Sequence, residues 1–350
     1  MSPTTNTRTG RARTTAASKK RSGAGTRSGK TPYSTEDLLG AYRRMSEIRA
    51  FEDRLHKENE TGDIPGFIHL YAGEEAIAVG VCDELRPTDF IASTHRGHGH
   101  CLAKGCDIQA MMCEIFGRAE GLGRGKGGSM HIADLSVGML GANGIVGGGP
   151  PLVTGAALTA KTLGTDGVAV SFTGDGGSNQ GLVFEAMNMA VVLQLPVVFV
   201  YENNGMGEAT GADFSVGSHD ISGRAAAFGM PAVKVDGTDY LAVRKAAAEA
   251  VARARSGGGP SVIEASAIRF YGHFEGDANL YRTPDQIKEY RATKDPLLIF
   301  RKKQEEVIDT ADLDAIDAAA VDEVDSAVAH ARAAAWPDPS EVLTDVYASY

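Results

Sequence analysis

The stretch Val168-Ala-Val-Ser-Phe-Thr-Gly-Asp-Gly176 decides the fold of this chain. Its apolar, β-branched first part, 168–173, predicts a buried strand that ends at a glycine-rich turn. A helix over 178–193 and a second strand over 195–201 follow, and the second strand leads to Asn203-Asn204. A strand–helix–strand crossover of this kind is almost always right-handed and makes its two strands parallel. We therefore predict the α/β class, with a doubly wound parallel sheet.

Asp175 and Asn204 follow these two strands and should meet at one edge of the sheet, where open α/β sheets bind ligands. A carboxylate, an amide oxygen and nearby backbone carbonyls suit Mg²⁺, because this ion completes its shell with phosphate oxygens and water. Gly176 has no Cβ, so the backbone there can approach a diphosphate closely. On their own, Gly-Asp-Gly is also typical of a turn and Asn-Asn of a helix cap. In this strand context we predict a magnesium–diphosphate site.

Further motifs carry a resemblance to a known family. Gly-Asp-Gly followed after 26 residues by Asn-Asn resembles the thiamine-diphosphate signature, and the flanking motifs resemble the alpha subunit of the 2-oxo acid and acetoin dehydrogenases. The flanking motifs are Gly66-Phe-Ile-His-Leu-Tyr-Ala-Gly-Glu-Glu75, Thr94-His-Arg-Gly-His98, Gly125-Lys-Gly-Gly-Ser-Met-His131, Gly141-Ala-Asn-Gly-Ile-Val-Gly147 and Tyr271-Gly-His-Phe274. The resemblance runs from about Tyr33 to Tyr347 and implies the thiamine-diphosphate-binding fold.

The resemblance assigns the metal and diphosphate ligands residue by residue. Asp175 and Asn204 would bind Mg²⁺ through their side chains, and Met206 through its backbone carbonyl. Gly176 and Gly177 would border the diphosphate of the cofactor. Thiamine diphosphate and Mg²⁺ are therefore the expected cofactors.

The rest of the cofactor site is implied in the same way. Arg96 has a planar, permanently charged guanidinium that matches phosphate oxygens, although a surface salt bridge is the ordinary alternative. His95 departs from the family, which has a tyrosine beside this arginine, and a diphosphate contact at His95 is expected because a donor is kept. The backbone at Gly144 and Val146 would face the aminopyrimidine ring, whereas the alternative is a buried glycine turn.

Histidines are the candidate proton carriers. His273, in Arg269-Phe-Tyr-Gly-His-Phe274, matches the family histidine at the reactive end of the cofactor, and a histidine there can move protons near neutral pH. His69 and His131 are carried over similarly, with His69 as the second catalytic candidate. Many relatives have a regulatory serine directly after the histidine that corresponds to His273. This chain has Phe274 at that position, which argues against phosphorylation there.

The residue spacing disfavours two other kinds of site. A zinc site formed by His95, His98, His100, Cys101 and Cys106 is the first, because their spacing fits no usual zinc pattern. The glycine-rich segment 121–128 lacks the Lys-Ser/Thr of a P-loop, and a mobile active-site loop fits it better.

The partners follow from a residue that we expect this chain to lack. In this family a glutamate activates the cofactor's aminopyrimidine, and in the two-chain members a separate beta subunit supplies it. We expect no pyrimidine-binding domain and no lipoyl module in this chain. The resemblance therefore implies a heterotetramer of two alpha and two beta chains, with a lipoyl acyltransferase receiving the product fragment.

The substrate is taken from the most specific motifs. Gly272-His-Phe-Glu-Gly-Asp277, Glu202-Asn-Asn-Gly205 and Gly207-Glu-Ala-Thr210 look most like acetoin dehydrogenase alpha chains, which implies cleavage of a C–C bond of acetoin. Pyruvate and branched-chain 2-oxo acids are the alternatives. A non-catalytic scaffold would not need Asp175, Asn204 and His273. An ordinary dinucleotide-binding dehydrogenase would need a Gly-x-Gly-x-x-Gly turn that segment 174–179 does not supply.

Composition divides the chain into two parts. Residues 1–32 carry eight basic and no acidic residues, which leaves 27 basic against 45 acidic residues, or a net charge of −18, in the remainder. We expect residues 1–32 to be a disordered basic arm; a transit peptide would show an amphipathic stripe, and a nucleic-acid-binding arm interleaved aromatics. The acidic remainder disfavours nucleic acid, and no apolar run is long enough to span a membrane. Four cysteines without a CxxC pair indicate a reducing, cytoplasmic setting.

Residues 33–350 should form the dehydrogenase domain, with a helical C-terminal segment at 285–350. Helices are expected over 33–56, 240–255 and 312–335, and strands over 231–237 and 260–265. Residues 62–151 are rich in glycine, and we expect them to be mainly binding loops.

Overall fold

The computed structural model describes residues 32–347. The predicted basic arm at 1–32 therefore lies almost entirely outside the described residues. Within them, no helix is both long and apolar enough to cross a membrane.

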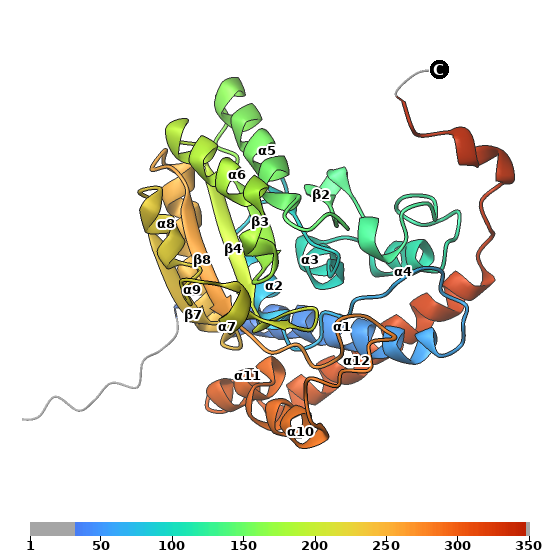
Figure 1. Cartoon of the computed structure of the whole chain (residues 1–350). Helices are drawn as coiled ribbons and strands as arrows, with labels where there is room; N and C mark the ends of the chain where they lie inside the picture. The colour runs from blue at the N-terminus through green and yellow to red at the C-terminus, as the bar shows by residue number, and fades with distance from the viewer. Residues whose placement is uncertain (1–31, 348–350) are drawn as a thin grey trace, which may run out of the picture. The chain divides into compact units, whose positions relative to one another are not determined.

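A parallel sheet of six strands forms the centre of the domain (Figure 1). Its order is β2-β1-β3-β4-β8-β7, and every neighbouring pair is parallel. The strands are β1 (Phe90–Ala92), β2 (Met139–Gly141), β3 (Ala169–Gly174), β4 (Val197–Asn203), β7 (Ala232–Asp236) and β8 (Ser261–Ser266). The predicted parallel sheet of the α/β class is confirmed.

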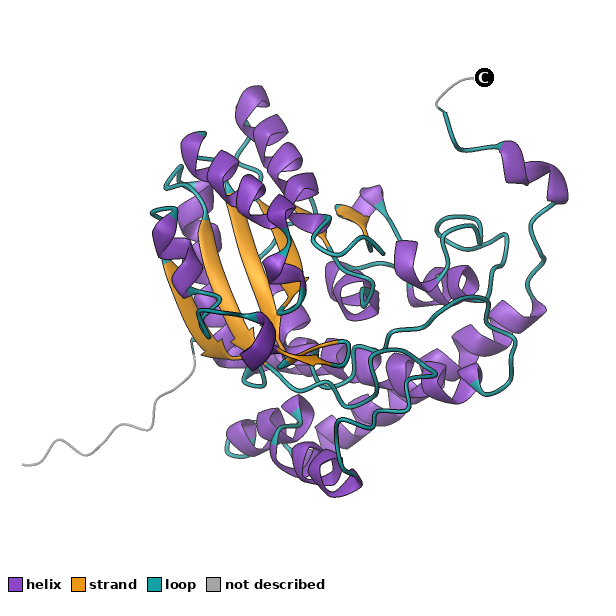
Figure 2. Ribbon diagram, in the orientation of Figure 1, coloured by secondary structure: helices purple, strands orange, loops and turns teal. Residues whose placement is uncertain are grey.

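Helices cover both faces of this sheet, as Figure 2 shows. On one face, α5 (Gly149–Leu163), α6 (Gly181–Val192) and α8 (Gly223–Ala227) pack against alternate strand residues such as Ala169 and Phe199. On the other face, α2 (Glu75–Cys82) and α9 (Tyr240–Arg255) pack against residues such as Val170, Phe172 and Val200. A strand buried on both faces has apolar residues at consecutive positions in the sequence. Segments 168–173 and 195–201 could be predicted as strands for this reason.

The remaining helices complete the second of these layers. Helix α1 (Thr35–Asn59) packs along α12 (Thr310–Ala333), and α12 also contacts α4 (Ile108–Ile115). Between α9 and α12 the chain forms α10 (Pro284–Thr293) and α11 (Pro296–Gln304). Helix α10 begins with a capping box, in which Thr283 accepts from the N–H of Gln286 and the Gln286 side chain accepts from the N–H of Thr283. The predicted helix at 240–255 has the observed bounds of α9.

The expectation that residues 62–151 are mainly loops is wrong in part. This region contains α2, β1, α3 (His98–Lys104), α4 and β2, with short 3₁₀ helices η1 (Ser129–His131) and η2 (Leu135–Val137). All eight residues of α2 are buried, so this helix has no polar face and no periodic stripe to reveal it. Helix α5 also went unrecognised; it begins Gly149-Pro-Pro, where proline suits a first helical turn.

Short elements surround the end of the sheet that carries the site. They are η3 (Gly177–Asn179), the two-stranded β5 (Met206–Gly207) and β6 (Thr210–Gly211), and α7 (Ala212–Ser215). The 3₁₀ helix η4 (Pro339–Leu343) lies near the C-terminus, away from the sheet (Figure 1). The predicted helix at 178–193 is thus a 3₁₀ turn followed by α6. The turn and α6 lie between β3 and β4, as the crossover requires.

Candidate functional site

A pocket of about 370 Å³ lies beyond the carboxyl ends of β1, β3, β4 and β8. Its volume falls in the range of small-molecule and cofactor sites, and its position is where open parallel sheets bind ligands. With the exception of His131, the predicted cofactor, metal and catalytic residues line it: His69, His95, Arg96, Gly144, Val146, Asp175, Gly176, Gly177, Asn204, Met206 and His273. Residues that lie as much as 204 positions apart in the chain therefore share one cavity.

Asp175 is the most unusual acid in this pocket. Gly174 pairs with Glu202 across β3 and β4, so Asp175 leaves the sheet beside the segment that leads to Asn204. Its side chain is 1% exposed, and its Oδ2 atom has no hydrogen-bond partner in the structure. Burial raises the pKa of this carboxyl group. A buried oxygen without a partner is rare and costly, and a bound cation would satisfy it.

Asn204 is held in one orientation by two neighbours. Its Nδ2 donates to Glu74 Oε1 at 2.8 Å, and its Oδ1 accepts from the backbone N–H of Met206 at 3.2 Å. Glu74 is buried, and burial followed by the nearby Glu202 carboxylate raises its pKa to about 7. The amide nitrogen of Asn204 is thus occupied by Glu74, so the amide oxygen is the atom left to serve as a ligand in the pocket.

Glycines keep the backbone next to Asp175 free of side chains. A Cβ on Gly176 would lie 3.1 Å from Cα of Gly207, and a Cβ on Gly177 would lie 3.0 Å from Cγ2 of Thr173. Both distances are tighter than ordinary contacts, so any side chain would disturb the packing of the pocket wall. The donor set of Asp175, Asn204 and a backbone with no side chains fits an oxygen-ligated Mg²⁺ with its diphosphate.

Two buried arginines place positive charge in the wall of the pocket. Arg96 donates to the carbonyl of Leu70 at 2.6 Å and to that of His273 at 2.7 Å, and so ties two pocket loops together. Burial, and then the charge of Arg269, lowers the pKa of Arg96 to about 10, which leaves it cationic at neutral pH. Arg269, which is 1% exposed, was missed from the sequence although it begins the motif that contains His273. Its Nη2 donates to the hydroxyl of Tyr281 at 2.7 Å.

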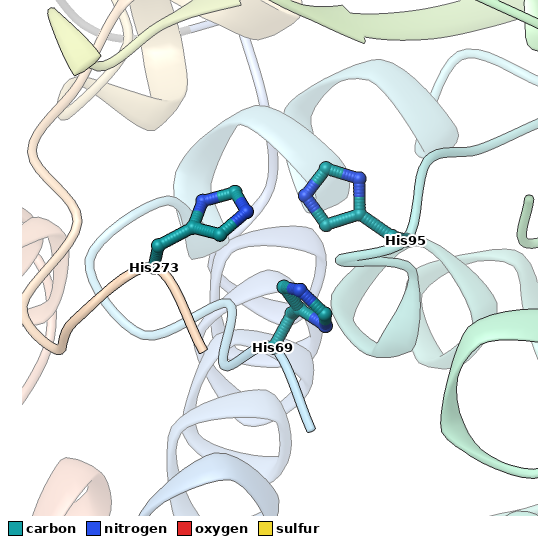
Figure 3. Close-up of side chains that lie close together, drawn as sticks. All are labelled: His69, His95 and His273. Atoms are coloured by element: carbon teal, nitrogen blue, oxygen red, sulfur yellow. The ribbon is translucent and has the colours of Figure 1, made fainter. Parts of the chain in front are cut away.

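Three histidines converge at one end of the pocket (Figure 3). Burial, together with the charge of Arg96 and of other neighbouring groups, lowers the pKa of His69 to about 2, that of His95 to about 3 and that of His273 to about 4. All three imidazoles are therefore neutral at pH 7. Each can accept a proton at one nitrogen and donate at the other, which is the form that general acid–base chemistry uses.

The other histidines near this end are engaged elsewhere. His98 lies 3.1 Å from Glu52 and 2.8 Å from the hydroxyl of Ser129, and both its ring nitrogens are thereby occupied. His131, which the resemblance also suggested, is exposed and is absent from the residues that line the pocket. A Cβ on Gly144 would lie 3.3 Å from the Nε2 atom of His131, so this histidine stands beside the pocket wall and its role stays a prediction.

A buried hydrogen-bond network adjoins the pocket. His100 is 2.7 Å from the hydroxyl of Ser93 and 3.0 Å from Glu202, to which the Tyr71 hydroxyl also donates. The ring nitrogens of His98 and His100 therefore make separate hydrogen bonds, and these residues do not form the alternative zinc site. Glu202 was missed from the sequence, because its contacts join segments about 100 residues apart.

The glycine-rich loop at 121–128 is folded around one carboxylate. The fully buried Glu114 accepts from the N–H groups of Gly123, Gly125, Gly127 and Gly128 at 2.7–3.1 Å. This arrangement satisfies both oxygens and holds a loop that leads to Met130 in the pocket wall. The expectation of a mobile loop is a prediction that these contacts do not test.

Comparisons with known proteins agree with this geometry. The family model described as "Dehydrogenase E1 component" matches residues 43–340. The alpha subunit of acetoin:2,6-dichlorophenolindophenol oxidoreductase from Cupriavidus necator is 54% identical over 321 residues, covering 91% of this chain and 96% of that protein. The protein of the same name from Bacillus subtilis is 55% identical over 315 residues, covering 90% and 95%. The alpha subunit of the pyruvate dehydrogenase E1 component from Rhizobium meliloti is 39% identical over 316 residues, covering 90% and 91%.

Proposed function

The chain belongs to the dehydrogenase E1 component family, and on that premise we propose that it is the alpha subunit of a thiamine-diphosphate-dependent acetoin dehydrogenase. The proposed reaction cleaves the C–C bond between the two oxygen-bearing carbons of acetoin and passes a two-carbon fragment to a lipoyl acyltransferase. The observation that carries the cofactor assignment is the buried, unpartnered oxygen of Asp175 beside the oriented amide of Asn204.

We assign the cofactor contacts as follows. Asp175, Asn204 and the carbonyl of Met206 would hold Mg²⁺, with the diphosphate against Gly176 and Gly177. The guanidinium groups of Arg96 and Arg269 would balance the phosphate charge from within the buried wall. The backbone at Gly144 and Val146 would face the aminopyrimidine ring. All of these groups line the pocket described above.

The histidines supply proton transfer for this chemistry. Thiamine diphosphate, when bound, provides a carbon nucleophile for the substrate carbonyl and accepts the electrons of the broken C–C bond. Acetoin also carries a hydroxyl group, whose proton must leave as the C–C bond breaks and acetaldehyde forms. The neutral imidazole of His273 is the base that we assign to this proton, and His69 and His95 lie within 5.2 Å of it, ring centre to ring centre.

Pyruvate is the second candidate substrate, because the pyruvate dehydrogenase alpha subunit from Rhizobium meliloti is 39% identical to this chain. Loss of CO₂ from a 2-oxo acid needs no hydroxyl proton to be removed. The higher identity to the acetoin proteins, 54–55%, favours acetoin over pyruvate and over branched-chain 2-oxo acids.

We propose that a beta subunit completes the site. The pocket includes Ile145 and Val146, which are 67% and 46% exposed, so its rim carries apolar groups that face outward. In the first turns of α5 and α6, at the same end of the sheet, Leu152 and Leu182 are each 46% exposed. Apolar side chains gathered around a ligand site are typical of a surface that a partner covers. A heterotetramer of two alpha and two beta chains is the assembly that we expect.

The cytoplasm is the compartment that we propose, because the four cysteines are unpaired and buried, as in proteins kept in a reducing environment.

Turnover by the assembled pair tests this function. The chain would be co-expressed with its beta subunit, and reduction of 2,6-dichlorophenolindophenol would be followed with acetoin or pyruvate in the presence of thiamine diphosphate and Mg²⁺. We expect acetoin to be preferred and both chains to be required. Preference for pyruvate would show that pyruvate, not acetoin, is the substrate. Turnover by this chain alone would refute the proposal that a beta subunit completes the site. The same pair carrying Asp175→Ala is the negative control.

A further inference from the structure

The wall of the pocket holds a compact group of three imidazoles. His69 precedes α2, His95 follows β1 and His273 follows β8, so three separate segments bring them together (Figure 3). One ring nitrogen from each lies within 4.8 Å of the other two. The ring centres are 4.5 to 5.2 Å apart, and the planes are inclined by 53–85°, so no ring stacks face to face on another.

Two nitrogens of this group have no partner. His69 is 92% buried, and its Nδ1 atom is without a hydrogen bond, as is the buried Nδ1 of His273. Buried polar atoms in proteins are nearly always hydrogen-bonded, so these two are exceptions that need an explanation. A metal ion would supply one, because it takes the lone pair of a neutral imidazole nitrogen.

We propose that His69, His95 and His273 form a second metal site, which binds Zn²⁺ or a similar divalent transition-metal ion and is distinct from the Mg²⁺ site at Asp175. Three imidazoles with one open position are a known donor set for zinc, copper and nickel, whereas Mg²⁺ prefers oxygen ligands. Zn–N bonds of about 2.0–2.1 Å in a tetrahedron place ligand nitrogens about 3.3 Å apart. Nitrogens now within 4.8 Å would therefore approach by roughly 1.5 Å at most.

The neighbouring charges set the strength of this site. Arg96 donates to the carbonyl of His273 and acts electrostatically on all three imidazoles, so its positive charge opposes a bound cation. We therefore expect weaker binding than at a structural zinc site. Since His273 is the base that we assign to the acetoin hydroxyl, a metal ion that takes its lone pair would inhibit turnover. The inhibition rests on the proposed function, whereas the binding does not.

Binding is measured on the assembled alpha–beta pair by titration calorimetry with ZnCl₂ in excess Mg²⁺. We expect one Zn²⁺ per alpha chain, and an affinity at least tenfold lower in His95→Gln. The matched control is His330→Gln, which alters an exposed histidine that contacts Glu120 on the surface, and it should bind as the wild type does. Asp175→Ala should keep its zinc affinity if the two metal sites are separate. Unchanged binding in His95→Gln, or lost binding in Asp175→Ala, would overturn the proposal.

A second measurement needs no substitution. Cu²⁺ bound to the wild-type pair should show nitrogen superhyperfine splitting in its electron paramagnetic resonance spectrum, and a spectrum with oxygen or sulfur ligands alone would refute the site. Inhibition is then followed with acetoin as substrate, where Zn²⁺ should inhibit the wild type and His330→Gln equally and in competition with acetoin. Inhibition that acetoin does not relieve would refute the proposed position of the ion. If no preparation turns over acetoin, the proposed function fails, and the binding and resonance results still decide the metal site.

Discussion

Replacing Asp175 with asparagine should have opposite effects on stability with and without the cofactor. Asp175 is 1% exposed and its Oδ2 is unpartnered, so without a cation the folded protein carries a buried, unsatisfied carboxylate. Such a group costs about 1–3 kcal/mol, and more when charged. Asparagine keeps the shape but removes the charge. We expect Asp175→Asn to stabilise the cofactor-free alpha–beta pair by about 1–2 kcal/mol, which is roughly 1–3 °C in melting temperature for a chain of this length.

With thiamine diphosphate and Mg²⁺ present, the order should reverse. At a ligand concentration one hundred times the dissociation constant, the wild type gains about 2.7 kcal/mol, while the variant should gain almost nothing. Differential scanning fluorimetry at pH 8, with and without both ligands, measures both effects. Asp166→Asn is the control, because this exposed aspartate pairs only at the surface with Arg86. An equal ligand-induced shift in Asp175→Asn and in the wild type would refute the assignment of Asp175 as a metal ligand.

Three further substitutions test neighbouring parts of the site. The pKa of Glu74 is raised in the folded state to about 7, so ionisation of this carboxyl group costs stability as the pH rises from about 4.5 to 7. Glu74→Gln should therefore raise the melting temperature of the cofactor-free pair at pH 8 and leave it nearly unchanged at pH 4.5. An equal effect at both pH values would contradict this. His273→Ala should reduce acetoin turnover by roughly 10²–10⁴-fold while the melting temperature changes little, since its Nδ1 makes no hydrogen bond; a wild-type rate would remove it from the mechanism. Glu114→Gln replaces one acceptor oxygen with a donor, so it should destabilise the protein by about 2–4 kcal/mol. Tryptic cleavage after Arg124 should also become faster. Unchanged cleavage would show that Glu114 does not hold the loop.

The central crossover was predictable because its two strands are buried on both faces. Strands β3 and β4 pack helices on each side, so their runs of apolar residues are continuous, and the turn after each strand is marked by glycine or asparagine. Parallel pairing then brings Asp175 and Asn204 to one edge whatever the rest of the chain does. The pocket residues in between could be named only because their motifs matched a family.

Long-range contacts were beyond the sequence. The hydrogen bond between Glu74 and Asn204 joins residues that lie 130 positions apart in the chain. Glu74 directly precedes α2, which is wholly buried, and a helix without a polar face leaves no periodic pattern by which to recognise it. Arg269 was quoted in a motif, but its complete burial depends on packing after β8 that no local pattern shows. The convergence of His69, His95 and His273 likewise depends on how three loops fold over the sheet edge.

The location of the metal tests the central claim most directly. The assembled alpha–beta pair would be crystallised with thiamine diphosphate and with Mn²⁺ in place of Mg²⁺, and the ion would be located by its anomalous scattering. We expect one strong peak per alpha chain, in contact with the side chains of Asp175 and Asn204 and the carbonyl of Met206, with the diphosphate lying against Gly176 and Gly177. A cofactor bound in the pocket with its metal away from Asp175 and Asn204, or a cofactor bound outside the pocket, would contradict the assignment.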